Sequence, residues 1–130
     1  MSRGFSFSLE PLLVLRKARE TEAAFELARA QRDLERAQNG LRELEAGMAG
    51  ALGEIARTGA TRVGEFEVAA AAVRRSIARF EEGVGEAKAA LSAAMRDRKA
   101  VEALKERRQA EFEAEEARKE ERELDEANHR

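Results

Sequence analysis

The chain has 130 residues, of which 38% are charged and 5% aromatic, with one Pro, one His and no Cys. This length suits a single small domain, and a chain rich in Ala, Glu, Arg and Leu is typical of long helices or a coiled coil. The net charge of -2 disfavours a dedicated nucleic-acid-binding protein, which usually carries a basic excess.

The sequence lacks the residues that most often serve in catalysis and metal binding. Without Cys there is no disulfide, zinc ribbon or thiol nucleophile. The single His is His129, next to the last residue, so the usual metal ligand and general base are missing as well. We therefore predict no catalytic, metal-binding or cofactor-binding residue and no small-molecule substrate. No apolar run approaches the ~20 residues of a membrane-spanning helix, and the N-terminus lacks the cleavage site of a secretory signal.

The first element is a predicted helix over residues 9–57. Pro11 falls in its first turn, where Pro is tolerated, and Ser8 or Glu10 is the expected cap. Apolar residues then repeat three and four positions apart, the pattern of a coiled-coil seam. The seam consists of Leu27, Ala30, Leu34, Ala37, Leu41, Leu44, Met48, Ala51 and Ile55. Upstream, Leu9, Leu12, Leu13, Leu15, Ala18 and Phe25 continue the helical spacing in a less regular register.

Residues 58–64 are predicted to form a turn. This TGATRVG segment contains two Gly, which end helices by adopting left-handed backbone angles. Thr61 is a candidate cap for the helix that follows. Other glycines lie inside the predicted helices, where they allow close approach of the backbone or local bending (Gly40, Gly47, Gly50, Gly53, Gly83 and Gly85).

The second predicted helix covers residues 65–127. Its seam repeats the three-four rhythm through Phe66, Ala70, Val73, Ile77, Phe80, Val84, Ala87, Leu91 and Ala94. Met95, Val101, Leu104 and Phe112 extend the seam with a shift of register. Beyond Phe112 only Leu124 is strongly apolar. The packed part of the helix is therefore expected to end near Phe112.

Two amphipathic helices joined by a short turn predict an antiparallel hairpin. With the turn centred near residue 61, Ile55 meets Phe66 and Met48 meets Val73. The first helix then begins opposite Glu113, and the second helix overhangs it by roughly 14 residues. The predicted fold is all-α: residues 1–130 form a single long antiparallel two-helix coiled-coil hairpin with the C-terminal helix overhanging.

Charge is unevenly distributed along the second helix. Basic residues are in excess over residues 96–108, and acidic residues over 109–130. Such polarity can steer a partner electrostatically, although it also arises by chance in a charge-rich helix.

The two ends of the chain carry recognisable patterns. The N-terminus reads Phe5-x-Phe7-x-Leu9-x-x-Leu12-Leu13-x-Leu15-Arg16-x-x-x-Glu20-x-x-Ala23. The C-terminus reads Lys105-x-x-x-x-Ala110-x-Phe112, followed by Arg118-Lys119-Glu-Glu-Arg-Glu-Leu124-Asp125-Glu126-Ala127. This ordered pair of ends resembles the flagellar FliJ family of export proteins. The length, the single turn and the lack of Cys also fit, and the resemblance covers essentially the whole chain.

The resemblance implies a non-enzymatic component of the flagellar type III protein export apparatus, and hence of bacterial motility. Family members fold as a two-helix coiled coil similar to the central stalk of rotary ATPases. The implied partners are the hexameric flagellar export ATPase, the membrane protein of the export gate and the export chaperones. The implied location is the cytoplasm, in peripheral association with the inner membrane at the flagellar base.

Two groups of residues are candidate contacts. The ATPase ring is expected to bind the open end of the hairpin through its basic side chains, namely Arg16, Lys17, Arg19, Arg107, Arg108, Arg118, Lys119 and Arg122. The export gate is expected to contact the middle of the hairpin through Leu41, Leu44, Met48, Val73, Ile77 and Phe80. Many family members carry aromatic residues in this middle region, where the present sequence has only Phe66 and Phe80.

Three alternatives stay open at this stage. The same fold would serve as the stalk of a virulence type III secretion system. A hairpin with basic residues between Arg96 and Arg108 could bind nucleic acid, although the net charge does not favour it. A chaperone or scaffold that self-associates is also physically plausible, because a two-helix seam leaves apolar surface half covered.

Overall fold

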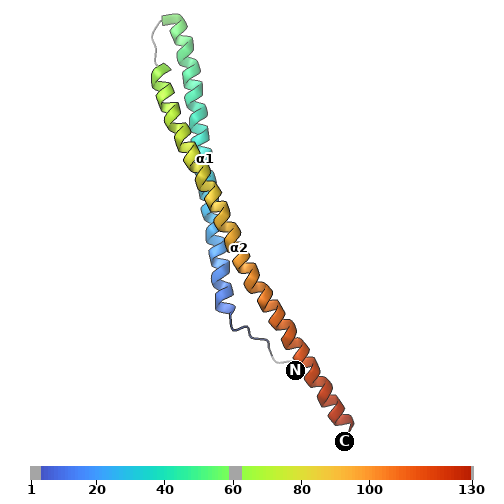
Figure 1. Cartoon of the computed structure of the whole chain (residues 1–130). Helices are drawn as coiled ribbons and strands as arrows, with labels where there is room; N and C mark the ends of the chain where they lie inside the picture. Colours follow the sequence, from blue (N-terminus) through green and yellow to red (C-terminus); the bar gives the residue numbers. More distant parts are fainter. Residues whose placement is uncertain (1–3, 59–62, 130) are drawn as a thin grey trace. The chain divides into compact units, whose positions relative to one another are not determined.

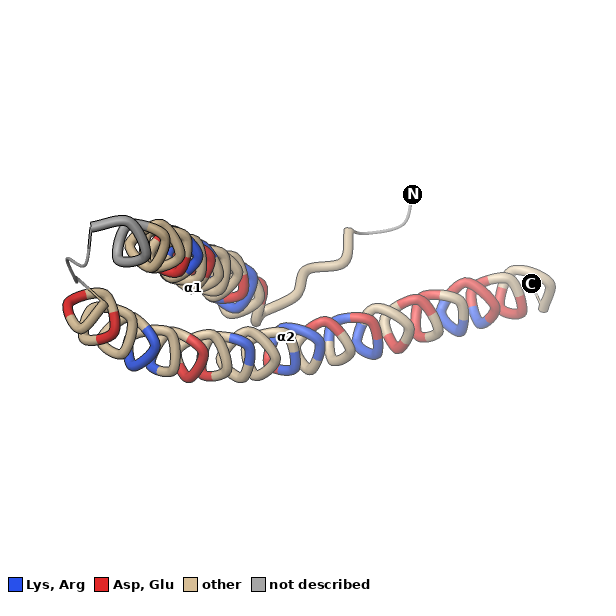
Figure 2. The backbone as a smooth tube through the Cα atoms, turned by 90° about the horizontal axis from the view of Figure 1, so that it is seen from above, with Lys and Arg blue, Asp and Glu red and all other residues tan. Residues whose placement is uncertain are grey.

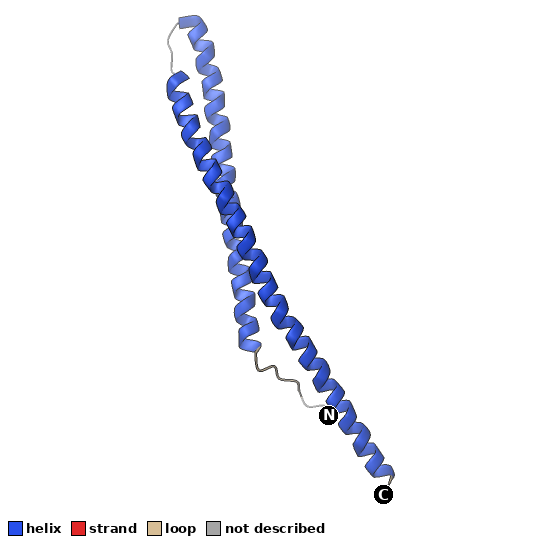
Figure 3. Cartoon of the chain, viewed as in Figure 1, coloured by secondary structure: helices blue, strands red, loops and turns tan. Residues whose placement is uncertain are grey.

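The computed structural model of the protein describes residues 4–58 and 63–129, most of which form two long helices (Figure 1). Helix α1 spans Glu10–Thr58 and helix α2 spans Val63–Asn128. The described residues contain no β-strand (Figure 3), so the predicted all-α class is confirmed. Residues 59–62, including Thr61, lie outside the described part. The remaining residues of the predicted turn, at 58, 63 and 64, are helical.

The helices divide along their length into two compact units. One comprises Met1–Thr21 and Ser92–Arg130 and is called the terminal unit below. The other, Glu22–Leu91, is called the turn-side unit. Within each unit the two helices run antiparallel. Glu45 pairs with Arg74 in the turn-side unit, and Glu10 pairs with Lys105 in the terminal unit.

The turn-side unit has the apolar seam that the three-four spacing predicts. Ala51, Ala70 and Val84 are buried. The other predicted seam residues whose side chains are described in this unit are half-buried, except Phe80, which is 37% exposed. The side chain of Ile55 is outside the described part. Coiled-coil spacing therefore identifies the packed face of both helices in this unit.

In the terminal unit, charged residues occupy positions of the same three-four sequence spacing. Counting back from Leu27 by four and three positions gives Ala23, still in the turn-side unit, and then Glu20, Arg16 and Leu13 in the terminal unit; all four are buried or half-buried. Stepping forward from Ala94 gives Arg98, Val101 and Lys105, which are also half-buried. Charged residues thus occupy positions of this spacing that a search for apolar residues skips. The residues predicted to extend the second seam, Met95, Val101, Leu104 and Phe112, are also half-buried. Leu15 and Phe25, assigned to the packed face, are 45% and 68% exposed.

The pairing of the helices differs from the predicted one by about a turn or more. The Phe66 ring lies against Gly47 rather than opposite Ile55. Glu20 pairs with Arg98. A turn centred at residue 61 would instead place Glu20 opposite residue 102, four positions further along α2. An apolar pattern that repeats every seven residues fits several pairings almost equally well. The ion pairs and the close approach at Gly47 distinguish them, and neither is visible in the apolar pattern.

Helix α1 starts opposite Lys105, not opposite Glu113 as predicted. Glu10 forms an ion pair of 2.8 Å with Lys105, and Pro11 occupies the first turn as expected. The non-helical residues that precede α1 cover the next part of α2. Beyond Phe112, the described α2 side chains are exposed with the exception of half-buried Glu116. The predicted overhang of α2 is therefore present.

Leu13 offers a direct test of the seam in the terminal unit. Its side chain is 2% exposed, whereas Leu15, two residues away on the same helix, is 45% exposed. Leu13→Ala should lower the free energy of unfolding by about 2–3 kcal/mol, in the lower part of the range for buried leucines. The matched change Leu15→Ala should cost less than about 1 kcal/mol. Urea unfolding followed by circular dichroism measures both, and equal losses would contradict the assigned face.

Gly47 and Gly50 test the close approach at Phe66. A Cβ atom at Gly47 would lie 2.9 Å from the Phe66 ring, whereas at Gly50 it would meet nothing within 4 Å. Gly→Ala inside a helix normally stabilises it by about 1 kcal/mol. We expect Gly50→Ala to raise the melting temperature and Gly47→Ala to raise it less or lower it. A gain at Gly47 as large as that at Gly50 would show that Phe66 does not pack there.

Candidate functional site

Among the described residues, no group of three or more His, Asp or Glu side chains is arranged to hold a metal ion. What the terminal unit presents instead is charge: Lys, Arg, Asp and Glu follow one another closely along the last turns of α2 (Figure 2). The candidate site is therefore a set of surfaces for partners, built from the N-terminal segment and the two helices.

The segment Gly4–Leu9, called the strap below, lies along α2 without being helical. Phe5 and Phe7 are half-buried and buried, whereas Ser6 and Ser8 between and after them are exposed. This alternation is expected of an extended chain, in which every second side chain faces the same way. It explains why the N-terminal motif has the spacing Phe-x-Phe.

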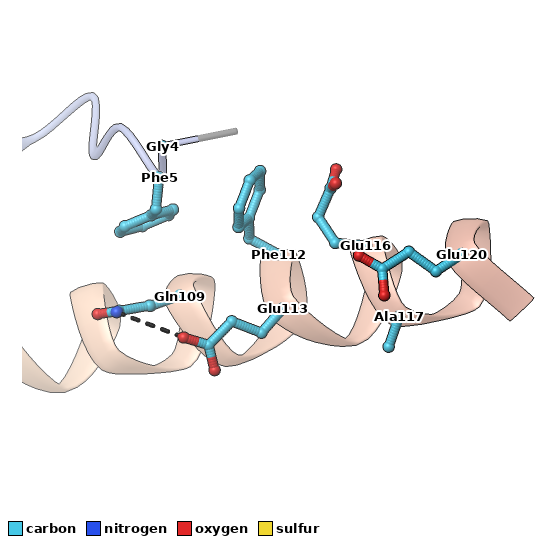
Figure 4. Close-up of a pocket in the computed structure, with 8 residues that line it drawn as sticks. All are labelled: Gly4, Phe5, Gln109, Phe112, Glu113, Glu116, Ala117 and Glu120. Atoms are coloured by element: carbon cyan, nitrogen blue, oxygen red, sulfur yellow. Dashed lines mark hydrogen bonds between the residues drawn. The ribbon is translucent and has the colours of Figure 1, made fainter. Parts of the chain in front are cut away.

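Two α2 residues hold the strap. The rings of Phe5 and Phe112 lie 5.7 Å apart between centroids, in a tilted arrangement (Figure 4). The guanidinium of Arg108 lies 5.8 Å from the centre of the Phe7 ring, within cation–π range. Its Nη1 also donates a hydrogen bond of 3.3 Å to Ser8 Oγ. The hydroxyl proposed as a helix cap thus accepts a hydrogen bond from the other helix.

A polar layer crosses the seam at Glu20, Arg98 and Glu102. Arg98 donates hydrogen bonds to Glu20 through Nε and Nη2, and one of 2.7 Å to Glu102 through Nη1. The side chains of Arg98 and Glu20 are 20% and 23% exposed. The hydrogen bonds to Glu20 raise the pKa of Arg98 above its ordinary value, and Glu102 acts in the same direction. This layer is absent from the sequence prediction.

Two of the basic residues predicted to bind a partner flank this layer. Arg16 forms an ion pair of 3.3 Å with Asp97, and Lys17 one of 3.8 Å with Glu102. The Nε atom of Arg16 is buried without a hydrogen-bond acceptor among the described residues. Arg16 is therefore mainly a seam residue, and its guanidinium contributes to packing between the helices as much as to the surface.

Arg19 and Arg107 are the free cations of the predicted set. Both side chains are exposed, and neither has an ion pair or hydrogen bond to the described part of the chain. Arg108, by contrast, contacts Phe7 and Ser8 of the strap. Of the predicted basic residues near the start of α1, Arg19 and Arg107 are thus the ones without an ion pair or a side-chain hydrogen bond to a described residue.

The remaining three predicted cations lie on the overhang. Arg118 and Arg122 both pair with Glu115, at 2.8 and 3.4 Å, and Lys119 pairs with Glu116 at 3.7 Å. The hydrogen bond from Arg118 lowers the pKa of Glu115 below its usual value. The stabilising effect of this group is present above its unfolded-state pKa and is lost as the pH falls through the lower folded-state pKa. Exposed ion pairs of this kind contribute little to stability.

The eight predicted basic residues all belong to the terminal unit, as the hairpin prediction required. The six residues assigned to the export gate belong to the turn-side unit, where they are seam residues. Sequence reasoning missed the strap and the polar layer as functional structure. The signal for the layer was available: Glu20 and Arg98 continue the three-four spacing of the two apolar seams.

Arg98 and Glu20 test whether the polar layer acts as a pair. Removing one partner leaves a half-buried charge without its hydrogen bonds, whereas removing both replaces the pair by apolar packing. We expect Arg98→Leu to lower the melting temperature and the double change Glu20→Leu with Arg98→Leu to recover most of the loss. Thermal unfolding of the two single variants and the double variant measures the coupling. Additive losses would show that the two side chains act independently.

Neither α1 nor α2, within the part that the structure describes, has an apolar stretch long enough to cross a membrane.

Comparison with curated proteins finds no match to this chain. Comparison with solved structures also finds none. A scan against protein-family models does give a match, to the flagellar FliJ protein family over residues 5–130. That range includes the strap from Phe5 onward, both helices and the overhang. The chain therefore belongs to the flagellar FliJ protein family.

Proposed function

We propose that the chain is a non-catalytic stalk of the flagellar type III export apparatus, one that binds and stimulates the hexameric export ATPase. The observation that carries the proposal is the family match over residues 5–130. It favours a flagellar role over a virulence secretion system. The two packed helices and the gathering of basic residues in the terminal unit agree with a protein that works by presenting surfaces.

The basic side chains of the overhang are suited to contact a ring of acidic or polar groups. Arg118, Lys119 and Arg122 are 63%, 50% and 66% exposed. Their present partners are glutamates three or seven residues away on the same helix. Because such exposed pairs are weak, a carboxylate of the ATPase can replace the intrahelical one at small cost. Arg19 and Arg107 add two unpaired cations in the same unit.

The wider proposal places the chain between the ATPase, the membrane export gate and the export chaperones, in the cytoplasm and peripherally at the inner membrane of the flagellar base. The gate contact is the weaker part. Leu41, Leu44, Met48, Val73 and Ile77 are half-buried in the seam, so a gate protein would reach their edges and the more exposed ring of Phe80.

Charge reversal of the overhang tests the ATPase contact. Arg118→Glu, Lys119→Glu and Arg122→Glu together should abolish stimulation of the flagellar export ATPase in a phosphate-release assay. Helicity, followed by circular dichroism, should change little. Because reversal adds three acidic residues to an acidic segment, the neutral triple variant with Gln at these positions should also be measured, and we expect it to lose most of the stimulation.

A matched control exists in the turn-side unit. Arg29, Arg32 and Arg36 are exposed, and two of them form the same kind of pair with an acidic residue three positions earlier on the helix. Changing all three to Glu alters the net charge by the same amount. The proposal predicts near-normal stimulation by this control. Undiminished stimulation by the overhang variants, or equal loss in the control, would refute a specific contact at Arg118, Lys119 and Arg122.

A further inference from the structure

Arg108 is held by neutral groups, unlike the paired cations elsewhere on α2. Its guanidinium lies 5.8 Å from the centre of the Phe7 ring, and its Nη1 donates a hydrogen bond of 3.3 Å to Ser8 Oγ. Other basic residues of this part of the helix form ion pairs with glutamates, namely Arg98, Lys105, Arg118, Lys119 and Arg122. Arg108 thus has defined contacts while no described carboxylate pairs with its charge.

The strap holds Arg108 without covering it. Arg108 is exposed, whereas Phe7 is only 7% exposed and is therefore fixed by its own packing. The hydrogen bond to Ser8 uses one of the five N–H donors of the guanidinium. The remaining donors have no acceptor among the described residues. Arg108 can therefore bind a carboxylate through two parallel hydrogen bonds without leaving the strap.

Arg108 lies on the same face of α2 as two cations of the overhang. Counting forward from Arg108 by four and three positions gives Phe112, Glu115, Lys119 and Arg122. With 3.6 residues per turn, these five positions fall within about 80° of the helix circumference. Three of them are basic and one is acidic, so this face carries an excess of positive charge. We call it the basic face.

We propose that Arg108 anchors the basic face to a carboxylate of the export ATPase, and that Phe7 is the residue that positions Arg108 for this contact. The inference rests on the proposed function and specifies the chemistry of the partner surface. Lys119 and Arg122 then meet further acidic groups up to about 20 Å along the helix.

Preorganisation explains why Arg108 is the anchor. Binding normally costs the rotamer freedom of each long side chain that it immobilises. The contacts with Phe7 and Ser8 already restrict Arg108 in the free protein. Arg118 and Arg122, by contrast, exchange a bond to Glu115 for the new one. The net gain from an ATPase carboxylate is therefore larger at Arg108.

The competing interpretation is an inhibitory strap, which withholds Arg108 until another molecule displaces it. The exposure of Arg108 favours positioning over inhibition. The two interpretations predict effects of opposite sign when the contact with Phe7 is weakened. Positioning predicts weaker binding to the ATPase, and inhibition predicts stronger binding.

The test measures stimulation of the flagellar export ATPase over a range of concentrations of the full chain. This titration separates the half-maximal concentration from the maximal rate. Arg108→Gln should raise the half-maximal concentration by about tenfold, the scale of one charge-assisted hydrogen-bonded contact. The matched control is Arg96→Gln. Arg96 is exposed, has no ion pair to a described residue and lies about 120° round α2 from Arg108, so its loss should cost less than about twofold.

A double-variant cycle tests whether Phe7 acts through Arg108. Phe7→Leu keeps an apolar side chain in the buried position but removes the ring face, and should raise the half-maximal concentration by about threefold. In the Arg108→Gln background, Phe7→Leu should add almost nothing, because the residue that it positions is gone. A purely structural role of Phe7 would give the same factor in both backgrounds. Circular dichroism of each variant checks that helicity is retained.

The outcomes separate this inference from the proposed function. If the wild-type chain does not stimulate the ATPase, both are overturned. If the wild type stimulates but Arg108→Gln behaves like Arg96→Gln, only the anchor role of Arg108 is overturned. Equal effects of Phe7→Leu in the two backgrounds would overturn the positioning role. A lower half-maximal concentration for Phe7→Leu would identify the strap as inhibitory and overturn the proposal.

Discussion

The packing of one helical stripe of α1 on one stripe of α2 is the interaction on which the rest of the structure depends. Two helices enclose little core, so the burial of residues along this stripe, such as Leu13, Ala70 and Val84, supplies most of the apolar stabilisation. The stripe keeps its three-four spacing into the terminal unit while its chemistry changes from apolar to charged. Every candidate surface is defined by its position relative to that stripe.

Replacing apolar seam residues by charged ones favours a single pairing of the two helices. An apolar seam tolerates sliding by a heptad, because Leu on Ala after a shift is nearly as favourable as before. Arg98 between Glu20 and Glu102 does not tolerate it, since a shift would leave half-buried charges without partners. The polar layer thereby fixes which α1 residues lie opposite which α2 residues. Fixed pairing in turn determines which part of α2 lies opposite the start of α1 and which part the strap contacts.

Sequence reasoning predicted the helices to within two residues at each described end and the packed face of the turn-side unit, because apolar periodicity reports burial directly. It misjudged the helix pairing, since a heptad pattern does not encode an absolute offset and the geometry at Gly47 depends on the partner helix. It placed the predicted basic residues in one unit. It could not distinguish Arg19, which is exposed and has no ion pair to a described residue, from Arg16, which is half-buried and pairs with Asp97. The strap was visible only as a motif, because a non-helical segment carries no helical period.

Pro11 has a consequence that extends beyond the start of α1. Its ring would clash with the carbonyl of the residue four positions earlier if the helix extended backward through the strap. The chain instead covers α2 with extended residues, which advance about twice as far per residue as a helix does. Within the described residues, the strap contacts Phe112 through the ring of Phe5. One proline near the N-terminus thus determines that α2, next to the start of α1, is faced by a non-helical segment and not by a longer first helix.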